Sequence, residues 1–272
     1  MKTCKWLHNV MLMVLMLPMG VLADDTIPDR TVITNAQMLG MGSSALLDTY
    51  LSPEKYKGME LRYISHTTRE YPQSRWVRQL VYEGCFATDE NRAGNSDEMA
   101  GMFNFSYALR HKWNLFDGNV CLQVGGTAEA TLGFIYNTRN GNNPAQAKAA
   151  LNIGPSAAAT YAFHLLRRPC FLRYELGVPL AGIMFSPNYG QSYYEIFSLG
   201  NYDHNVVPTT IVSAPSVRQM LTIDIPISRL TFRLGYMGDY RQTKANNLKY
   251  HSYSHLFVVG LVRKFTITNI LP

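Results

Sequence analysis

One short cluster in this chain carries residue types that could catalyse hydrolysis. It is Tyr250–His255, with the sequence YHSYSH. A serine nucleophile needs a histidine base and an orienting carboxylate within hydrogen-bond reach. On a strand, neighbouring side chains point to opposite faces, so the two histidines would share one face and the two serines the other. This spacing disfavours a Ser–His contact within the strand. A catalytic site that recruits a cross-strand partner such as Glu83 or Asp239 stays open as an alternative. Rim residues of a barrel are the simpler interpretation.

The other candidate ligands show no metal-binding spacing. The scattered histidines and cysteines are His66, His111, His164, His204, Cys85, Cys121 and Cys170. Three cysteines beyond the N-terminal segment cannot form a closed disulfide framework, and none are in CxxC spacing. Asp24-Asp25 and Asp97-Glu98 lie in polar segments, whereas calcium needs six to eight oxygens held by a defined loop. We therefore expect no metal site and no cofactor.

The elements that would position these residues alternate apolar and polar side chains. From Met99 to Arg110, Phe103 and Phe105 fall on one face and Asn104 on the other. A period of two over this length predicts a strand with one apolar and one wet face. The expected strands cover part of 38–50, then 59–68, 76–87, 99–110, 119–136, 151–165, 171–184, 217–227, 230–240 and 252–265. Long amphipathic strands that recur along an exported chain predict an all-β, antiparallel up-and-down transmembrane β-barrel of about ten strands, within roughly eight to twelve. Two further short strands inside 192–212 would give the upper number.

The inward faces of these strands carry charges of both signs. The predicted lumen polar network is Glu60, Arg62, Glu129, Arg173, Glu175, Arg218, Asp224 and Arg233. A barrel of about eight strands is only just wide enough for side chains to fill it, and buried charges need partners. We expect a plugged polar core. A narrow channel or a small-ligand cavity is the alternative, because inward positions such as Gly125, Ala158 and Gly177 are small.

The N-terminus predicts export. Lys2 and Lys5 precede an apolar run from Val10 to Leu17, and small residues near Ala23 predict cleavage after it. The run is shorter than the roughly 20 residues of a helical span. We therefore expect a signal peptide at 1–23, a periplasmic segment at 24–37 and a barrel domain at 38–272. The net charge of +6, with 16% charged residues and no basic stripe, gives no indication of nucleic-acid binding.

The longest irregular segment runs from Pro187 to Pro215. Its tyrosines are candidates for a binding surface: Tyr189, Tyr193, Tyr194 and Tyr202. Loops of this length are uncommon unless they are functional or disordered, and Tyr and Asn suit adaptable binding surfaces. The alternative is a loop that folds into the barrel mouth or onto the outer leaflet. Connections of alternating length along the chain favour periplasmic termini and long external loops.

The segment Leu47 to Tyr63, LDTYLSPEKYKGMELRY, resembles an uncharacterised group of exported β-barrel proteins from Bacteroidota, known by a domain of unknown function. The resemblance covers most of the chain after the signal peptide, and Thr49-Tyr50-Leu51-Ser52-Pro53 is its most specific part. It implies an outer-membrane barrel and brings no catalytic residue with it. Many barrels end in an aromatic residue on the last strand, whereas Phe265 is the nearest aromatic to this C-terminus.

These observations predict an integral outer-membrane barrel of a Gram-negative bacterium. Its expected partner is outer-membrane lipid, and its expected role is structural or binding through external loops, toward a small ligand or a surface partner. The alternatives are a narrow channel or transporter, a barrel enzyme that modifies lipid or lipopolysaccharide, and a soluble periplasmic barrel that binds a ligand. Strands longer than the usual five or six residues of soluble sheets favour the membrane.

Overall fold

The alternating sequence forms long strands along the whole described chain. The computed structural model describes residues 30–141, 143–165, 168–227 and 230–267, and the predicted signal peptide lies outside these ranges. The strands are β1 (Thr31–Asp48), β2 (Tyr56–Glu70), β3 (Trp76–Asn91), β4 (Asp97–Leu115), β5 (Val120–Asn137), β6 (Ala145–Leu165), β7 (Arg168–Gly177), β8 (Ala181–Phe185), β9 (Val206–Thr210), β10 (Ser216–Ile227), β11 (Leu230–Ala245) and β12 (Leu248–Ile267). A five-residue helix, α2 (Tyr193–Phe197), lies between β8 and β9. Within the described ranges, no helix is long and apolar enough to cross a membrane.

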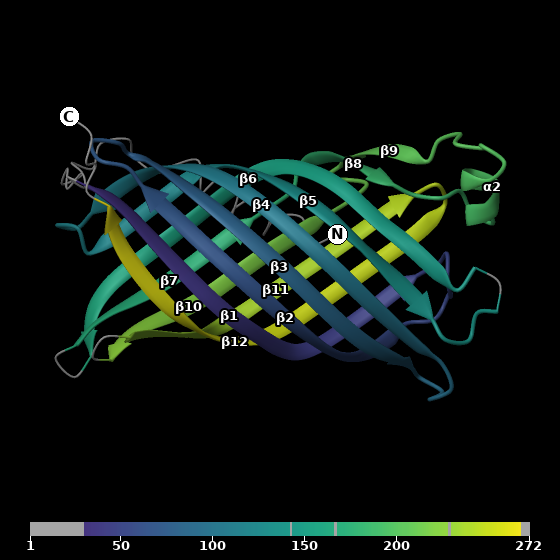
Figure 1. Ribbon diagram of the computed structural model, residues 1–272, viewed down its shortest axis with the longest axis horizontal. Helices are drawn as coiled ribbons and strands as arrows, with labels where there is room; N and C mark the ends of the chain where they lie inside the picture. The colour runs from purple at the N-terminus through teal and green to yellow at the C-terminus, as the bar shows by residue number, and fades with distance from the viewer. Residues whose placement is uncertain (1–29, 142, 166–167, 228–229, 268–272) are drawn as a thin grey trace, which may run out of the picture.

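Ten strand positions close into a barrel (Figure 1). Strands β1 to β7 pair antiparallel in sequence order, β7 pairs with β10, and β11 and β12 follow. The ring closes where β12 pairs with β1, from Thr31 opposite Ile267 to Asp48 opposite Tyr250. The predicted antiparallel barrel of about ten strands is confirmed. We call the end where Thr31 meets Ile267 the termini end, and the opposite end the α2 end.

Two of the ten positions are interrupted strands. Strand β8 continues the edge of β6 beyond β7, because the Leu180 N–H still donates to the Ile153 carbonyl (2.9 Å) between the two strands. Strand β9 pairs with β8 and occupies the same position in the ring as β10, which follows it in the chain. The sequence predicts one strand over 171–184 and allows two short strands inside 192–212. The structure has α2 and β9 in the latter range, and β9 lengthens the position of β10 instead of adding a strand to the ring.

Strands β3 and β4 reach further toward the α2 end than the sequence predicts. A loop is expected over 88–98, but β3 continues to Asn91 and β4 begins at Asp97. The physical reason is that Asp89 and Glu98 face the lumen, where they are 2% and 0% exposed. Charged residues that point into a polar lumen give a strand the composition of a loop.

Strand β1 includes residues 31–37, which the sequence predicts as a periplasmic segment. These residues look like a polar lead-in because two of their outward side chains, Asn35 and Gln37, are amides. The amides are satisfied across the sheet: Asn35 donates to Thr67 Oγ1 (2.8 Å) and Gln37 donates to Ser65 Oγ (3.0 Å). The barrel therefore begins earlier than its predicted boundary at residue 38.

A two-residue turn joins β11 and β12, where the sequence predicts a longer polar connection. Asn246 and Asn247 have φ angles of 49° and 62°. Two successive left-handed residues form a type I′ turn, and asparagine tolerates this conformation better than most residues. By contrast, the connection between β8 and β9 covers residues 186–205, which we call the β8–β9 segment.

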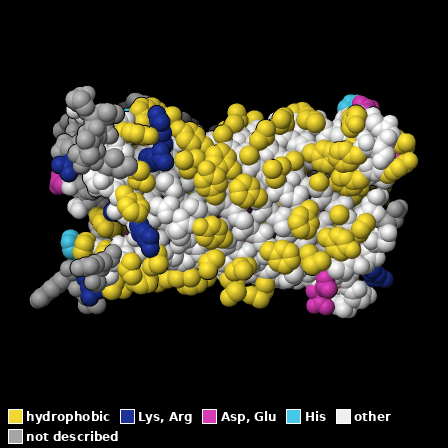
Figure 2. All heavy atoms as spheres, in the orientation of Figure 1, with side chains coloured by type: hydrophobic (Ala, Val, Ile, Leu, Met, Phe, Trp, Pro, Cys, Tyr) yellow, Lys and Arg dark blue, Asp and Glu magenta, His cyan; other side chains and the backbone are white. Residues whose placement is uncertain are grey.

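The two faces of the barrel wall differ sharply in polarity. Leu61, Phe103 and Leu132 point outward and are 54%, 49% and 60% exposed, whereas Arg62 and Asn104, beside them in sequence, are 6% and 5% exposed. Figure 2 shows hydrophobic side chains over the body of the barrel, with Lys and Arg mainly at the termini end. Apolar outside and polar inside is the arrangement of a membrane barrel and the reverse of a soluble one.

Part of the lumen is packed with apolar side chains, which we call the apolar layer. Its members are Ala36, Met38, Ile64, Val81, Met220, Met237, Leu256, Val258 and Val262. They come from β1, β2, β3, β10, β11 and β12, so they fill the side of the lumen next to the closing seam. Ile64, Met237, Leu256 and Val258 are 0% exposed.

Candidate functional site

A network of ion pairs crosses the lumen, centred on Arg62. Its Nε lies 2.6 Å from Glu60 Oε1, and its Nη1 lies 2.7 Å from Asp239 Oδ2 and 3.5 Å from Glu83 Oε2. Arg218 makes a further ion pair with Glu83. Glu60 and Arg62 share a face of β2 because they are two residues apart, while the other partners come from β3, β10 and β11. Side chains from distant parts of the ring therefore meet inside the barrel.

Arg241 extends this network to the opposite wall. Its Nη2 lies 2.8 Å from Glu129 Oε1 on β5, and its Nε lies 3.1 Å from Asp239 Oδ1 on its own strand. It also donates from Nη1 to Thr131 Oγ1 (3.0 Å). We call these residues the central cluster: Glu60, Arg62, Glu83, Glu129, Arg218, Asp239 and Arg241. Each charged member has an opposite charge within ion-pair distance, which buried charges require.

A second network, nearer the termini end, is centred on Glu175 of β7. Arg173 Nε lies 2.5 Å from Glu175 Oε1, Arg110 Nη2 lies 3.8 Å from Oε2, and the Gln79 amide donates to Oε2 (3.0 Å). His66 Nε2 is 3.6 Å from the same carboxylate. Four strands thus converge on one buried carboxylate.

An adjacent pair completes this network. Arg233 and Asp224 are direct cross-strand partners on β11 and β10. The guanidinium contacts both carboxylate oxygens, with Nε–Oδ1 at 2.6 Å and Nη2–Oδ2 at 2.8 Å. This bidentate geometry fixes both side chains in one arrangement. We call the whole group the termini-side cluster: His66, Gln79, Arg110, Arg173, Glu175, Asp224 and Arg233.

All eight predicted lumen residues point into the barrel. The central cluster contains Glu60, Arg62, Glu129 and Arg218, and the termini-side cluster contains Arg173, Glu175, Asp224 and Arg233. The structure therefore divides the predicted single network into two groups.

Sequence reasoning missed Arg241, which bridges two walls of the central cluster. The ninth strand is predicted to end at Tyr240, but β11 continues to Ala245. Extending the same alternation by two residues from Asp239 places Arg241 on the inward face, so the signal was present in the sequence.

The lumen contains a cavity of about 180 Å³. Its lining includes Arg62 and Arg218 of the central cluster, together with Met102, Val217 and Tyr250. The ion-paired clusters and the apolar layer occupy much of the rest of the lumen.

An ion pair lies toward the α2 end of this cavity. Lys148 Nζ lies 2.7 Å from Asp48 Oδ2 and 4.0 Å from the centre of the Tyr250 ring. Ser44 donates a hydrogen bond to Asp89 beside them. Asp89 and Lys148 lie in strand extensions outside the predicted strands, whereas Ser44 and Asp48 lie within the predicted range 38–50; none of the four was among the lumen candidates.

The YHSYSH cluster lies on β12 with its serines and histidines on opposite faces. Ser254 is buried and donates to Glu60 in the central cluster. His255 points outward, with Nδ1 2.7 Å from Tyr236 Oη and 3.3 Å from Tyr240 Oη. The structure does not bring a serine of this cluster to a histidine.

The other candidate ligands are dispersed. Asp97 faces outward and Glu98 inward, so the acidic pair shares no site. His111 packs against Trp76 and Trp113, with ring centroids 5.3 and 4.4 Å apart. In the described part of the chain, no three His, Cys, Asp or Glu residues are placed to hold a metal ion, and Cys85, Cys121 and Cys170 are free thiols. Asp24 and Asp25 lie outside the described residues.

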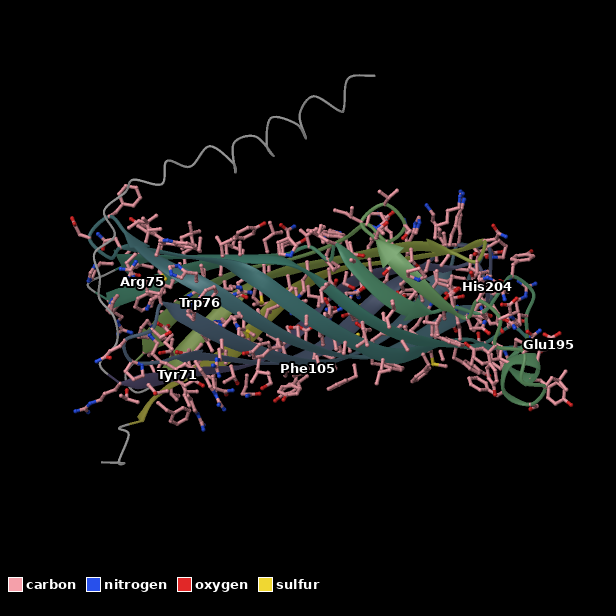
Figure 3. The ribbon with its side chains drawn as sticks, turned by 90° about the horizontal axis from the view of Figure 1, so that it is seen from above. Tyr71, Arg75, Trp76, Phe105, Glu195 and His204 are labelled. Carbon is pink, nitrogen blue, oxygen red and sulfur yellow. The ribbon has the colours of Figure 1, made fainter. Side chains whose placement is uncertain are left out.

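The β8–β9 segment presents aromatic side chains at the α2 end. Tyr189, Tyr194 and Tyr202 are 72%, 65% and 63% exposed. Tyr193 is different: it packs inward, and its hydroxyl accepts a hydrogen bond from the Ala147 N–H (2.6 Å). Three of the four predicted loop tyrosines are therefore open to a partner, and the fourth attaches the segment to β6. Figure 3 shows Glu195 and His204 at this end, with Tyr71 and Trp76 at the other.

Hydrogen bonds hold the β8–β9 segment in one conformation. Ser192 and Glu195 form a capping box at the start of α2, and the Gln191 amide donates to the Asn201 carbonyl (3.0 Å). Tyr50 donates to the Gln191 carbonyl (2.9 Å). Burial, with smaller contributions from nearby Tyr193 and acidic groups, raises the pKa of Tyr50 to about 12. Tyr50 therefore remains a neutral donor at physiological pH.

The closed ring, the apolar exterior and the charged, filled lumen together define an outer-membrane-type β-barrel. Within that class, the chain belongs to the family described as "Protein of unknown function (DUF3316)", whose model matches residues 9–270. No curated protein matches the sequence.

Solved structures of similar outline are bacterial outer-membrane proteins. The transport unit of the autotransporter AIDA-I from Escherichia coli has a TM-score of 0.47 and 8% identity, covering 96% of this chain and 97% of that one. The outer-membrane protease OmpT from Escherichia coli has a TM-score of 0.46 and 6% identity, covering 89% and 99%. The translocator domain of the autotransporter NalP from Neisseria meningitidis has a TM-score of 0.39 and 10% identity, covering 96% and 95%. None of these similarities assigns a function to this chain.

Proposed function

We propose that this protein is an integral barrel of the outer membrane of a Gram-negative bacterium, closed to ions, with a binding role at its α2 end. The proposal includes export by residues 1–23, with cleavage after Ala23. It also includes a source among the Bacteroidota, as the resemblance of residues 47–63 implies. Outer-membrane lipid is the proposed partner of the barrel wall.

The observation that carries the proposal is the distribution of polarity across the wall. The lumen contains charged side chains paired with one another, as Arg62 and Arg233 illustrate. The exterior exposes large apolar side chains on all sides of the ring, such as Met41, Leu132 and Ile153 at 59%, 60% and 62%. Water would penalise that exterior, whereas hydrocarbon favours it. A transmembrane strand needs about 9–11 residues, and most strands here exceed this length.

The connections favour one orientation in the membrane. External loops of outer-membrane barrels are longer than periplasmic turns, and the termini are periplasmic. The β8–β9 segment is at the α2 end, and Thr31 and Ile267 meet at the other. We therefore propose that the α2 end faces outward.

The filled lumen supports a closed barrel. The central cluster joins β2, β3, β5, β10 and β11 across the interior, and the apolar layer fills the space near the seam. A conducting pore needs a continuous wet path, and paired arginines and packed methionines obstruct one. The exposed tyrosines of the β8–β9 segment then remain as the surface available to a partner.

Heat-modifiable gel mobility tests the membrane assignment. The full chain, extracted in detergent from outer-membrane fractions, should run as a fast band that shifts to its ordinary mass on boiling. N-terminal sequencing of the same band should begin at Asp24. A protein found in the soluble periplasmic fraction without a mobility shift would contradict the proposal and favour the soluble alternative.

A narrow channel is the second candidate, because the lumen retains a cavity of about 180 Å³. Conductance of planar bilayers containing the folded protein separates the two. We expect no channel openings from the wild-type protein, and openings only when Arg62 and Arg241 are both replaced by alanine. Steady openings of the wild-type protein would reverse the choice. The lipid-modifying alternative gains nothing from the YHSYSH cluster, whose serines and histidines are separated by the barrel wall.

A further inference from the structure

The hairpin formed by β11 and β12 carries an unneutralised positive pair on its outer face. Lys244 and Lys249 are direct cross-strand partners beside the turn at the α2 end, and both side chains are exposed. Like charges directly opposite each other destabilise a sheet. Neither amine has an acidic partner within ion-pair distance among the described residues. The outward positions of both strands carry no Asp or Glu along the described hairpin.

Below the lysines, the same face changes from charged to polar to apolar. Tyr236 and Tyr240 point outward, and their hydroxyls meet His255 Nδ1 at 2.7 and 3.3 Å. Gly238 makes this possible, because a Cβ there would lie 2.9 Å from the Tyr240 hydroxyl and 3.1 Å from that of Tyr236. Further toward the termini end, Phe257 is 63% exposed and opens the apolar part of the face.

The order of charged, polar and apolar groups along this face matches a phosphorylated lipid lying lengthwise on the wall. Amines at the rim fit a phosphate, hydroxyl and imidazole groups fit the polar linkage below it, and exposed apolar residues fit acyl chains. We infer that the outer face of the β11–β12 hairpin is a binding site for a phosphate-bearing lipid of the outer leaflet, with Lys244 and Lys249 holding the headgroup. The inference rests on the proposed function, because it needs the α2 end at the outer leaflet.

Two other hairpins at the same end lack this gradient, whereas the β1–β2 hairpin beside β12 carries a single exposed lysine, Lys57, opposite Ala45. On β3 and β4, Glu90 and Asp97 are cross-strand partners, so that rim position is acidic. On β5 and β6, the outward face is apolar to the strand ends, with Tyr136 opposite Ala145. A cross-strand pair of lysines therefore occurs at the β11–β12 rim and not at these other rims, and the acidic pair offers a matched control.

Native mass spectrometry of the folded full-length protein in detergent tests the site, with diphosphoryl lipid A as the probe. Each exposed lysine that pairs with a lipid phosphate contributes up to roughly fivefold in affinity. The variant Lys244→Gln/Lys249→Gln should therefore bind the probe up to roughly 25-fold more weakly. Arginine at both positions should retain binding, and Glu90→Gln/Asp97→Asn should not weaken it. All variants are first checked for the heat-modifiable band, and serine replaces glutamine if that double variant does not fold.

Each result distinguishes this inference from the proposed function. Equal binding by the wild-type protein and the glutamine variant would overturn the lipid site. So would equal affinity for an uncharged diacylglycerol. Competition by inorganic phosphate at the probe's own concentration would indicate a site for the free ion instead of a lipid headgroup. A wild-type protein without a heat-modifiable band would remove the proposed function itself, whereas a normal band without lipid preference would remove only the site.

Discussion

The central cluster makes a quantitative prediction about Arg62. Replacement by methionine removes the guanidinium while keeping an unbranched side chain of similar length. Of its three acidic partners, Glu83 keeps Arg218 and Asp239 keeps Arg241, but Glu60 keeps only the Ser254 hydroxyl. One buried carboxylate therefore loses its only cation.

The size of the effect follows from that count. Removing one partner of a buried ion pair costs about 3–5 kcal/mol, and because two of the three acids keep a cation, we expect the lower end, about 3 kcal/mol. Adding Glu60→Gln to Arg62→Met removes the uncompensated charge and should restore about 2 kcal/mol of the free energy of unfolding. Leu61→Ala, on the lipid face of the same strand, is the control and should show no coupling to Glu60→Gln.

The assay is equilibrium unfolding by guanidinium in detergent micelles, followed by tryptophan fluorescence. All four combinations of the Glu60 and Arg62 variants form a double-mutant cycle. A double variant no more stable than Arg62→Met, or an Arg62→Met variant within about 0.5 kcal/mol of the wild-type protein, would refute the reasoning. Either result would mean that water hydrates these carboxylates and that the lumen is more open than its contacts suggest.

Three further predictions concern the α2 end. Ser192→Ala removes the α2 cap and should destabilise the helix by about 1 kcal/mol. Amide exchange over residues 193–197 should therefore accelerate roughly fivefold, and an unchanged rate would contradict the capping role. Hydrogen bonds from the backbone N–H and hydroxyl of Ser192 lower the pKa of Glu195 below its ordinary 4.5, so this capping contribution is present above that pH and is lost as the pH falls through the lowered value. The protection factor of the helix amides, which corrects for the pH dependence of intrinsic exchange, should be high at pH 5 and fall only at lower pH. Loss of protection already at pH 5 would contradict this sign. Asn246→Gly preserves the turn but removes the side-chain hydrogen bonds to three carbonyls of the β8–β9 segment. Proteases should therefore cut that segment faster than in Asn247→Gly, and equal cutting would exclude a tether.

Alternation with the apolar face turned outward predicted the facing of most strands, but not of β8, where Ala181 pairs with the outward Ile153 and is exposed instead of inward. Because side chains alternate strictly along a strand, one well-placed pair such as Phe103 and Asn104 determines the facing of the whole element. The lumen candidates followed from the same rule. Their partners did not, because the ion pair between Arg62 and Asp239 joins residues far apart in the chain and depends on the curvature of the closed ring.

Strand ends were harder to predict than strand faces. A polar residue near an end can belong to a loop, to a rim or to the lumen, and composition does not distinguish these environments. Asp89 and Glu98 therefore looked like loop residues although they lie on strands. The α2 helix was also beyond sequence reasoning, since five residues give too short a period to recognise.

The seam between β1 and β12 has a consequence for biogenesis. It joins the first and last described strands, so no shorter nascent chain can complete the ring. Until β12 arrives, β1 and the growing edge both present unpaired backbone groups, which are templates for aggregation. On the proposed export route, a periplasmic chaperone that covers these edges until β12 arrives would protect the chain from aggregation.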